Sequence, residues 1–380
     1  MSDSASKGQD FESSLSKANA QVAEFEKREG LGPKIQHALH VTPSLVPLIV
    51  LVISVIIFGV LLGSKFFSPF ALTLILQQVQ IVGIVAVAQS LVILTAGIDL
   101  SVGAIMVLSS VVMGRLAFFG IAFPIPLVGY AFSDSGFWYW LTIPALPTGL
   151  AILVGLCVGT FVGFLNGWLV AKVKLPPFIV TLGMWQIVLA TNFLYSANET
   201  IRSQDIAADA PLLQFFGTTI QLGSARLTYG AVFMVLLFIL MAYILKQTAW
   251  GRHVYAVGDD KEAAELSGIE ANKVLISVYM ASGLICAFAG WALIGRIGSV
   301  SPTSGQLANI ESITAVVIGG ISLFGGRGAV MGSLFGALIV GVFTLGLRLL
   351  GADAQWTYLL IGLLIIGAVA VDQWIRKVSS

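Results

Sequence analysis

Long apolar segments alternate with short polar ones along nearly the whole chain. A helix that spans a bilayer needs about 20 predominantly apolar residues. The segments predict an all-α integral membrane protein with ten transmembrane helices, at residues 44–63, 70–95, 101–120, 145–171, 178–196, 228–245, 274–295, 310–322, 328–350 and 356–371. The eighth segment is short, so it is either re-entrant or begins earlier. Glycines at four-residue spacing predict close helix packing, at Gly155, Gly159, Gly163 and Gly167.

Positive charge predicts the orientation of these helices, because Lys and Arg concentrate in the cytoplasmic loops of membrane proteins. With both termini in the cytoplasm, most of the 20 basic residues fall on the inside, whereas the opposite orientation places them outside. Residues 1–43 then form a cytoplasmic N-terminal tail, and residues 44–376 form the transmembrane domain. The segments 121–144 and 197–227 become outer loops, and the aromatic residues of the first favour the headgroup level.

A polar stretch at residues 246–273 interrupts the apolar pattern and predicts a short cytoplasmic helix. Asp259 is placed to cap its N-terminus, with Glu262 three residues later as the capping-box partner. Gly268 is placed to end the helix in the left-handed conformation. Residues 260–267 therefore predict a two-turn helix. A helix this short needs a surface to pack against, which is either its own protein, the membrane surface or a partner protein.

Composition excludes several classes of protein. The chain is 57% hydrophobic and 10% charged, whereas soluble domains average about 25% charged residues. A net charge of +1 without a basic run indicates no nucleic-acid partner. The sequence lacks the G-x-x-x-x-G-K-[ST] phosphate loop, so the chain does not hydrolyse ATP by that route. Cys157 and Cys286 lie in apolar segments and are expected to be small core residues, and no cluster predicts a metal or catalytic site.

Polar side chains inside the apolar segments are mostly neutral, which argues against an ion-coupled carrier with buried ionisable groups. Any one of them could simply bond neighbouring helices, but together they predict a path for a polar, uncharged solute. They are Gln77, Gln78, Gln80, Gln89, Ser90, Thr95, Asn166, Gln186, Thr191 and Asn192. The candidates chosen for the path are Gln77, Gln80, Gln89, Thr95 and Asn166. Asp99 is expected to cap the third helix rather than to line the path.

Four stretches together resemble the permease subunits of monosaccharide ABC importers of the ribose, xylose and fructose type. They are LTAGIDLSVG at 94–103, AAELSGI at 263–269, GRIGS at 295–299 with Pro302 and Gly305, and AVVIGGISLFGGRG at 315–328. The likeness covers residues 44 to 376. The tail and the aromatic stretch 127–144 are most similar to fructose permeases of this class. The chain departs from the common pattern at 259–261, at 307–310 and in that aromatic stretch.

The resemblance implies a ten-helix permease of the bacterial inner membrane that works as a homodimer. It implies two cytoplasmic ATPase subunits, which hold ATP and Mg²⁺, and a periplasmic sugar-binding protein; no cofactor is expected in this chain. The short cytoplasmic helix would be the coupling helix seated in a groove of the ATPase. Its implied contact residues are Asp260, Glu262, Ala263, Ala264, Leu266, Ser267 and Gly268.

The predicted function is therefore ATP-driven import of a pentose or hexose by a transport subunit that is not an enzyme. Arginines on the outer side could pair with acidic patches of the binding protein, namely Arg202, Arg226, Arg296 and Arg348. The alternative is an ATP-independent sugar carrier or facilitator that needs no partner. A membrane-embedded enzyme is disfavoured because no group of His, Cys or carboxylate side chains stands out.

Overall fold

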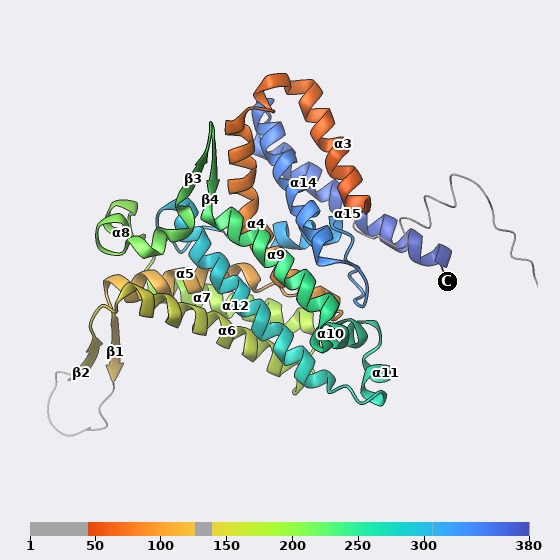
Figure 1. The fold of residues 1–380 in the computed structure, drawn as a ribbon. Coiled ribbons are helices and arrows are strands. Elements are labelled where there is room, and N and C mark those ends of the chain that lie inside the picture. The colour runs from red at the N-terminus through yellow and green to blue at the C-terminus, as the bar shows by residue number, and fades with distance from the viewer. Residues whose placement is uncertain (1–44, 126–138, 306, 380) are drawn as a thin grey trace, which may run out of the picture. The chain divides into compact units, whose positions relative to one another are not determined.

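The computed structural model describes residues 45–125, 139–305 and 307–379 (Figure 1). The predicted tail 1–43 and the centre of the aromatic stretch lie outside the described residues. The apolar helices are α3 (Leu45–Leu62), α4 (Pro69–Leu94), α5 (Val102–Phe118), α6 (Thr148–Ala171), α7 (Pro177–Ser196), α9 (Tyr229–Gln247), α12 (Ala271–Ile297), α13 (Ala308–Ile318), α14 (Val330–Leu349) and α15 (Ala354–Ser379). Two shorter helices, α10 (Ala249–Asp259) and α11 (Lys261–Leu266), separate α9 from α12.

Seven described helices are long and apolar enough to cross a membrane, namely α3, α4, α6, α7, α9, α12 and α14. The other apolar helices are shorter: α5, α13 and the stretch Gln355–Gly367 of α15. Each predicted apolar segment thus contains one helix, and the eighth is short, as its sequence indicated. A non-helical stretch before α13 contacts α7, where Asn192 donates to the Pro302 carbonyl (2.9 Å). Asn309, the second residue of α13, donates to the Leu100 carbonyl just before α5 (3.1 Å).

The fold is mostly helical as expected, but each of the two predicted outer loops contains a short β-hairpin, which an all-α fold does not include. The strand β1 (Ile121–Ile125) pairs antiparallel with β2 (Tyr139–Ile143), and β3 (Thr219–Leu222) pairs with β4 (Ala225–Thr228). A two-residue turn joins β3 to β4, and Gly223 there has a φ of +63°, which glycine adopts without strain. A Gly-Ser pair between short strands is a hairpin signal, so this hairpin was readable from the sequence. The second loop also contains α8 (Ser203–Asp209) and the 3₁₀ helix η2 (Pro211–Gly217).

The core of the bundle forms around α12, which packs against α4, α5 and α6. A Cβ atom added to Gly163 would lie 2.2 Å from the Tyr279 carbonyl oxygen, and one added to Gly283 would lie 2.2 Å from the Gly159 carbonyl oxygen. No side chain fits at these two crossings, so the α6 glycines allow the close approach that their spacing predicted. Cys286 is buried, as expected of a core residue. Cys157 is exposed, so the expectation that it is also a core residue is wrong.

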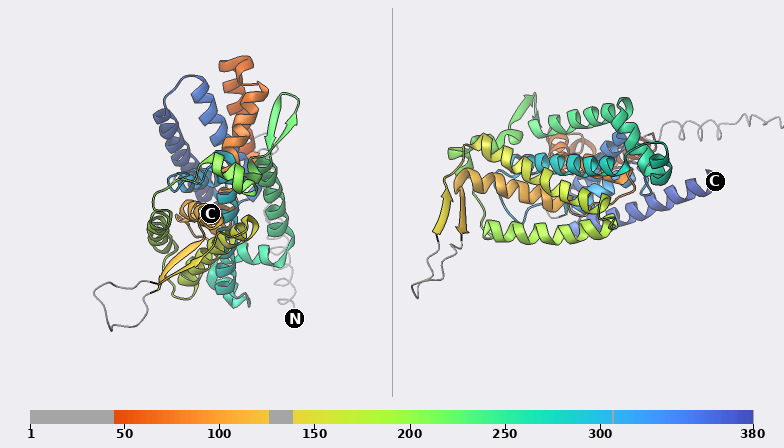
Figure 2. Two further views of the ribbon diagram at one scale, coloured as in Figure 1. Left: turned by 90° about the vertical axis from the view of Figure 1, so that its left-hand side faces the viewer. Right: turned by 90° about the horizontal axis from the view of Figure 1, so that it is seen from below.

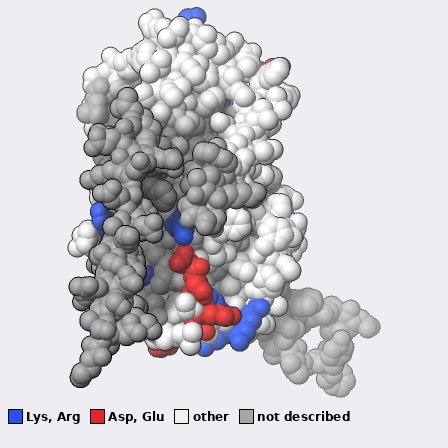
Figure 3. Space-filling view, turned by 90° about the vertical axis from the view of Figure 1, so that its right-hand side faces the viewer, with Lys and Arg blue, Asp and Glu red and all other residues white. Residues whose placement is uncertain are grey.

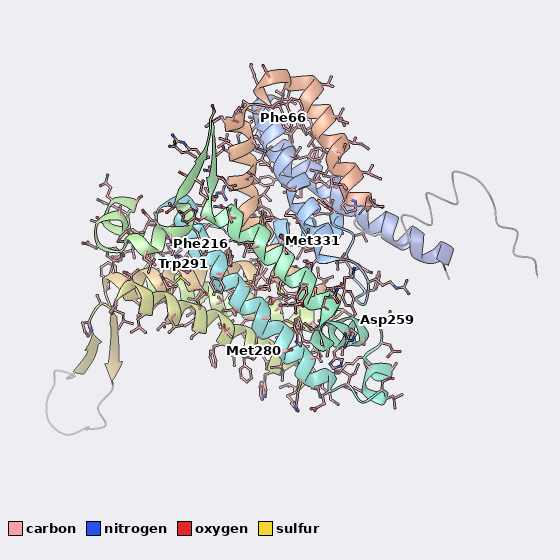
Figure 4. All side chains as sticks on the ribbon, viewed as in Figure 1. Phe66, Phe216, Asp259, Met280, Trp291 and Met331 are labelled. Carbon is pink, nitrogen blue, oxygen red and sulfur yellow. The ribbon has the colours of Figure 1, made fainter. Side chains whose placement is uncertain are left out.

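The two ends of the bundle differ in the elements that cover them. The hairpin β1–β2 lies at the end opposite to α10 and α11 in two perpendicular views (Figures 1 and 2). The 3₁₀ helix η2 packs on the C-terminal end of α12, where the Phe216 and Trp291 rings meet edge to face with centroids 4.7 Å apart (Figure 4). Arg115 of α5 pairs with Glu199 at 2.9 Å. The predicted outer loops and the predicted cytoplasmic stretch therefore belong to different ends.

Candidate functional site

The short helix predicted in the polar stretch exists as α11, but its N-terminal cap is one residue later than expected. The Asp260 carboxylate accepts a hydrogen bond from the Ala263 N–H (3.0 Å), whereas Asp259 is the last residue of α10. The shift arises because α10 occupies the chain up to Asp259, so only Asp260 has the extended backbone that a cap requires. Glu262 lies in the first turn, where a negative charge suits the helix dipole.

The C-terminal end of α11 has the predicted left-handed glycine. Gly268 has a φ of +85°, and its N–H donates to the Glu265 carbonyl (3.0 Å). The Ile269 N–H donates to the Ala264 carbonyl (3.0 Å). This pair of bonds is a Schellman motif, and the Ser267 hydroxyl adds a bond to the Ala263 carbonyl (2.9 Å). A helix of six residues is thus closed at both ends by its own hydrogen bonds.

The two faces of α11 differ sharply in exposure. Ala264 is 4% exposed and turns towards the rest of the chain, whereas Leu266 is 91% exposed. Between residues 259 and 270 the chain has five carboxylates and one lysine. Figure 3 shows Asp and Glu side chains gathered in one run on the side of the molecule that carries α10 and α11. The free face of α11 is therefore acidic with one large apolar side chain at its tip, and Ala264 belongs to the anchored face.

The helix α10 was not predicted, and it anchors α11 to the bundle. Thr248 caps it by accepting from the Gly251 N–H (3.2 Å). Its buried residues are Gly251, Val254, Val257 and Gly258, which share one helical face. The Trp250 indole donates to the Ser277 hydroxyl (2.8 Å). Figure 4 labels Asp259, the last residue of α10, at the same end of the molecule. The signal that could have found α10 is the capping threonine followed by this apolar spacing.

Three chain segments meet where α10 packs on the bundle. A Cβ atom at Gly258 would lie 1.7 Å from the Leu94 carbonyl oxygen at the end of α4. The same oxygen accepts from the Gly326 N–H (3.0 Å). The Tyr255 hydroxyl donates to the Gly328 carbonyl (2.9 Å), and burial raises the pKa of this tyrosine above its usual value, which keeps the donor protonated. The helix α10 therefore packs directly against the end of α4 and against the loop before α14.

The structure does not bring the five predicted path residues together. Gln80 accepts from the Thr228 hydroxyl (2.6 Å) near the N-terminus of α9. Gln89, with its amide oriented to satisfy both groups, bonds the backbone of Asp99 at 3.0 and 3.3 Å. These two, Thr95 and Asn166 are buried, while Gln77 is half-buried. Four of the five thus form hydrogen bonds within the protein. This is the alternative role that the sequence left open for each of them.

Asp99 and Asn166 belong to one buried polar cluster at the start of α5. The Asp99 carboxylate accepts from the N–H (2.8 Å) and the hydroxyl (2.6 Å) of Ser101, and the Asn166 amide donates to the same hydroxyl (2.9 Å). Asp99 therefore holds the turn before α5, although its bonds go to Ser101 and not to a helical N–H as expected. Asn166 connects α6 to this turn.

The four predicted docking arginines occupy different surroundings. Arg202 precedes α8 and Arg226 lies in β4, both exposed. Arg296, at the C-terminal end of α12, donates to the Gln78 side chain (2.5 Å), and Arg348 is exposed in the last turn of α14. An open hollow of about 450 Å³ beside Arg202 is lined by three carboxylates as well. The sequence reasoning missed these carboxylates, Glu199, Asp205 and Asp209, which make the surface there mixed in charge.

Comparison with known proteins shows the family to which the chain belongs. The sequence profile of a family described as branched-chain amino acid transport system / permease component matches residues 71–369. The fructose import permease protein of Rhizobium meliloti is 65% identical over 373 residues, which are 98% of this chain and 97% of the relative. The chain belongs to this permease family. No solved structure matches the permease.

More distant relatives agree with this placement. The ribose import permease protein of Bacillus subtilis is 35% identical over 86% of this chain and 92% of its own. The galactose/methyl galactoside import permease protein of Escherichia coli is 32% identical over 85% of this chain and 91% of its own. The permease is therefore a transport component and not an enzyme, and it is a multi-pass protein of the inner membrane. In the described residues no three His, Cys, Asp or Glu side chains could hold a metal ion together.

Proposed function

We propose that this permease is the transmembrane subunit of an ATP-driven importer that carries a monosaccharide, fructose, across the inner membrane. The support for the sugar is the 65% identity with a fructose import permease, which extends over almost the full length of both chains. The relatives named for ribose and galactose are 35% and 32% identical. Fructose is neutral and polyhydroxylated, which suits a bundle whose interior polar groups are mostly amides and hydroxyls.

The proposed assembly contains two copies of the chain, each with ten membrane-crossing helices and both termini in the cytoplasm. Residues 44–376 form the membrane domain in contact with lipid, 246–273 the cytoplasmic coupling loop, and 121–144 and 197–227 the outer loops. Two cytoplasmic ATPase subunits supply the energy and hold ATP and Mg²⁺. A periplasmic sugar-binding protein delivers the sugar from the opposite side, and no nucleic acid takes part.

The observation that carries the proposal is the free face of α11. A leucine that is 91% exposed at the tip of a capped helix has no contact in its own chain that would explain it. Burial of a leucine side chain contributes about 1.5–3 kcal/mol, so this tip is suited to a partner with an apolar pocket. The carboxylates of residues 259–270 predict a basic rim around that pocket. We assign the partner as the ATPase subunit.

The contact of α10 with the bundle gives the proposed coupling a route. When ATP binding moves the ATPase, α11 moves with it, and α10 is joined to α11 through Asp260 alone. Because Gly258 touches the Leu94 carbonyl, α10 cannot shift without displacing the end of α4. Interfaces packed this tightly switch between discrete arrangements rather than deform continuously. The helices would in this way alternate between inward-open and outward-open states.

Docking of the binding protein is proposed at the outer end. The exposed arginines Arg202, Arg226 and Arg348 can meet acidic patches on its lobes, and the carboxylates near Arg202 can meet basic ones. Arg296 is engaged with Gln78 and is the weakest of the four candidates. Charges at the rim of an interface change the association rate more than the affinity.

The test is purification of the tagged permease from native membranes in mild detergent, with co-purifying proteins identified by mass spectrometry. The proposal expects a stoichiometric ATPase that is lost when Leu266 is replaced by Arg, while the amount of permease in the membrane stays the same. A permease that purifies alone and still moves fructose into liposomes without ATP would refute the proposal and identify a facilitator.

A further inference from the structure

One spanning helix, α7, exposes a polar side chain at the middle of its length. Gln186 is the tenth of the twenty residues Pro177–Ser196 and is exposed. Its amide makes no hydrogen bond within the described residues. The opposite face of α7 is buried through Val180, Met184, Val188 and Asn192, and it packs on α5. The exposed amide therefore points away from its own bundle.

The exposed face of α7 also carries apolar side chains, such as Ile179 and Ile187, but the other described spanning helices expose no amide at mid-length. The mid-length exposed residues of α9 are Val235, Leu236, Ile239 and Leu240, and α3 exposes only aliphatic side chains, such as Ile53 and Ile56. Faces of this composition suit contact with lipid chains. An amide at the same depth has no partner in hydrocarbon and is unfavourable there. The α7 face must instead meet water or another protein chain.

The surroundings of Gln186 leave room for a ligand. Gly183, one turn earlier, has no atom within 4 Å of an added Cβ, and Ala190, one turn later, is short and exposed. The Thr191 hydroxyl bonds the Ile187 carbonyl (2.8 Å), so its polarity is satisfied within the helix. The exposed surface around the amide is therefore apolar, with Leu182 and Ile187 beside it. A sugar ring presents C–H groups as well as hydroxyls, and such a surface matches both.

We propose that this face of α7 is a wall of the sugar path, and that the Gln186 amide hydrogen-bonds the hydroxyls of the passing neutral sugar. An amide donates and accepts at once, as a hydroxyl does, and it carries no charge that would have to lose its hydration. Because the other face of α7 is buried in its own bundle, the opposite wall comes from a second copy of the chain. This inference rests on the proposed function, since it requires the permease to carry a sugar as a dimer.

The test places single cysteines on α7 and α9 in a variant whose exposed native thiol is removed, Cys157→Ser; Cys286 is buried and stays. Gln186→Cys is compared with Ile239→Cys, which is 54% exposed at the middle of α9. The probe is a membrane-impermeant, water-soluble thiosulfonate, applied to the complex with its ATPase in membrane vesicles. We expect Gln186→Cys to react, to lose uptake on reaction, and to react more slowly in excess fructose, while Ile239→Cys stays unlabelled.

A second variant measures the sugar contact itself. Gln186→Leu removes the hydrogen-bonding groups from the exposed face, and we expect the KM for fructose uptake to rise about fivefold, the value of one neutral hydrogen bond. Gln186→Asn retains an amide and should recover part of that loss. The ATPase should co-purify equally well with both variants, because neither touches α11.

Two results would overturn the inference. One is a Gln186→Cys variant that reacts no faster than Ile239→Cys, which would make the α7 face a lipid contact. The other is formation of an intermolecular disulfide at residue 186 on oxidation while the thiosulfonate finds no access, which would make it a closed contact between copies. In either case ATP-dependent uptake by the Cys157→Ser parent would still support the proposed function, whereas absence of that uptake from the parent would refute the function itself.

Discussion

Replacement of Leu266 by Ala is the substitution that tests the coupling interface most selectively. The side chain is 91% exposed at the end of α11 and has no place in the core of its own chain. Truncation of an exposed side chain typically changes the free energy of unfolding by about 0.5 kcal/mol or less. The caps of α11, made by Asp260 and Gly268, are untouched. The permease should therefore fold, insert and keep α11 in place.

We expect the Leu266→Ala substitution to lower only the affinity of the permease for the ATPase. The substitution removes three carbon atoms, and burial of each contributes about 0.8 kcal/mol, which gives about 2 kcal/mol for a side chain that passes from exposed to buried. Since 1.4 kcal/mol corresponds to a tenfold change in an equilibrium constant, each ATPase subunit should bind about 30-fold more weakly. Two copies of α11 in a dimer would make the loss from the whole complex larger.

The assay is titration of the purified ATPase onto the permease in nanodiscs, with Leu266→Ala compared with Leu194→Ala. Leu194 is 83% exposed near the C-terminal end of α7, at the end of the bundle that carries the predicted outer loops. The control should bind the ATPase as the unaltered permease does. A Leu266→Ala permease that binds within about threefold of the unaltered protein, less than 1 kcal/mol of difference, would refute the assignment of α11 as the docking element.

The remaining predictions concern the anchoring of α10 and α11 and one outer ion pair. Gly258→Ala forces α10 off the Leu94 carbonyl, at a cost of about 1–3 kcal/mol, so ATP-driven uptake should fall while the ATPase still co-purifies. Asp260→Ala removes the cap to Ala263 and should weaken α11 by about 1 kcal/mol, seen as faster hydrogen exchange that Asp260→Asn largely restores. Arg115→Met breaks a partly exposed ion pair and should change the free energy of unfolding by about 1 kcal/mol or less.

The sequence predicted the apolar helices well because hydrocarbon thickness imposes their length. It predicted α11 and Gly268 because caps act through neighbouring residues, but it misplaced the cap by one residue because α10 was missed. It could not tell which polar residues bond within the bundle. Spanning helices are apolar on all sides, so no stripe marks the inner face. Gln89 and Gln186 look equivalent in sequence, yet one is buried beside Asp99 and the other is exposed.

The sequence also could not show which face of α11 a partner would contact. Ala264 and Leu266 both lie within the predicted helix, and the more apolar leucine would normally be assigned to the anchored face. The structure reverses this order, since the alanine is buried and the leucine exposed. A substitution such as Ala264→Arg would therefore disturb the anchoring of α11 first, and Leu266 is the sharper probe of a partner.

We propose that this permease moves fructose only when ATPase subunits act on it through α11. The direct measurement is uptake of radiolabelled fructose into liposomes that contain the purified permease, with its binding protein supplied on the outer side. We expect uptake with the ATPase and Mg-ATP on the α11 side, and none when either is omitted or when Leu266 is replaced by Arg. Equal uptake by the permease alone, without ATP, would show that it is a facilitator that does not need the ATPase.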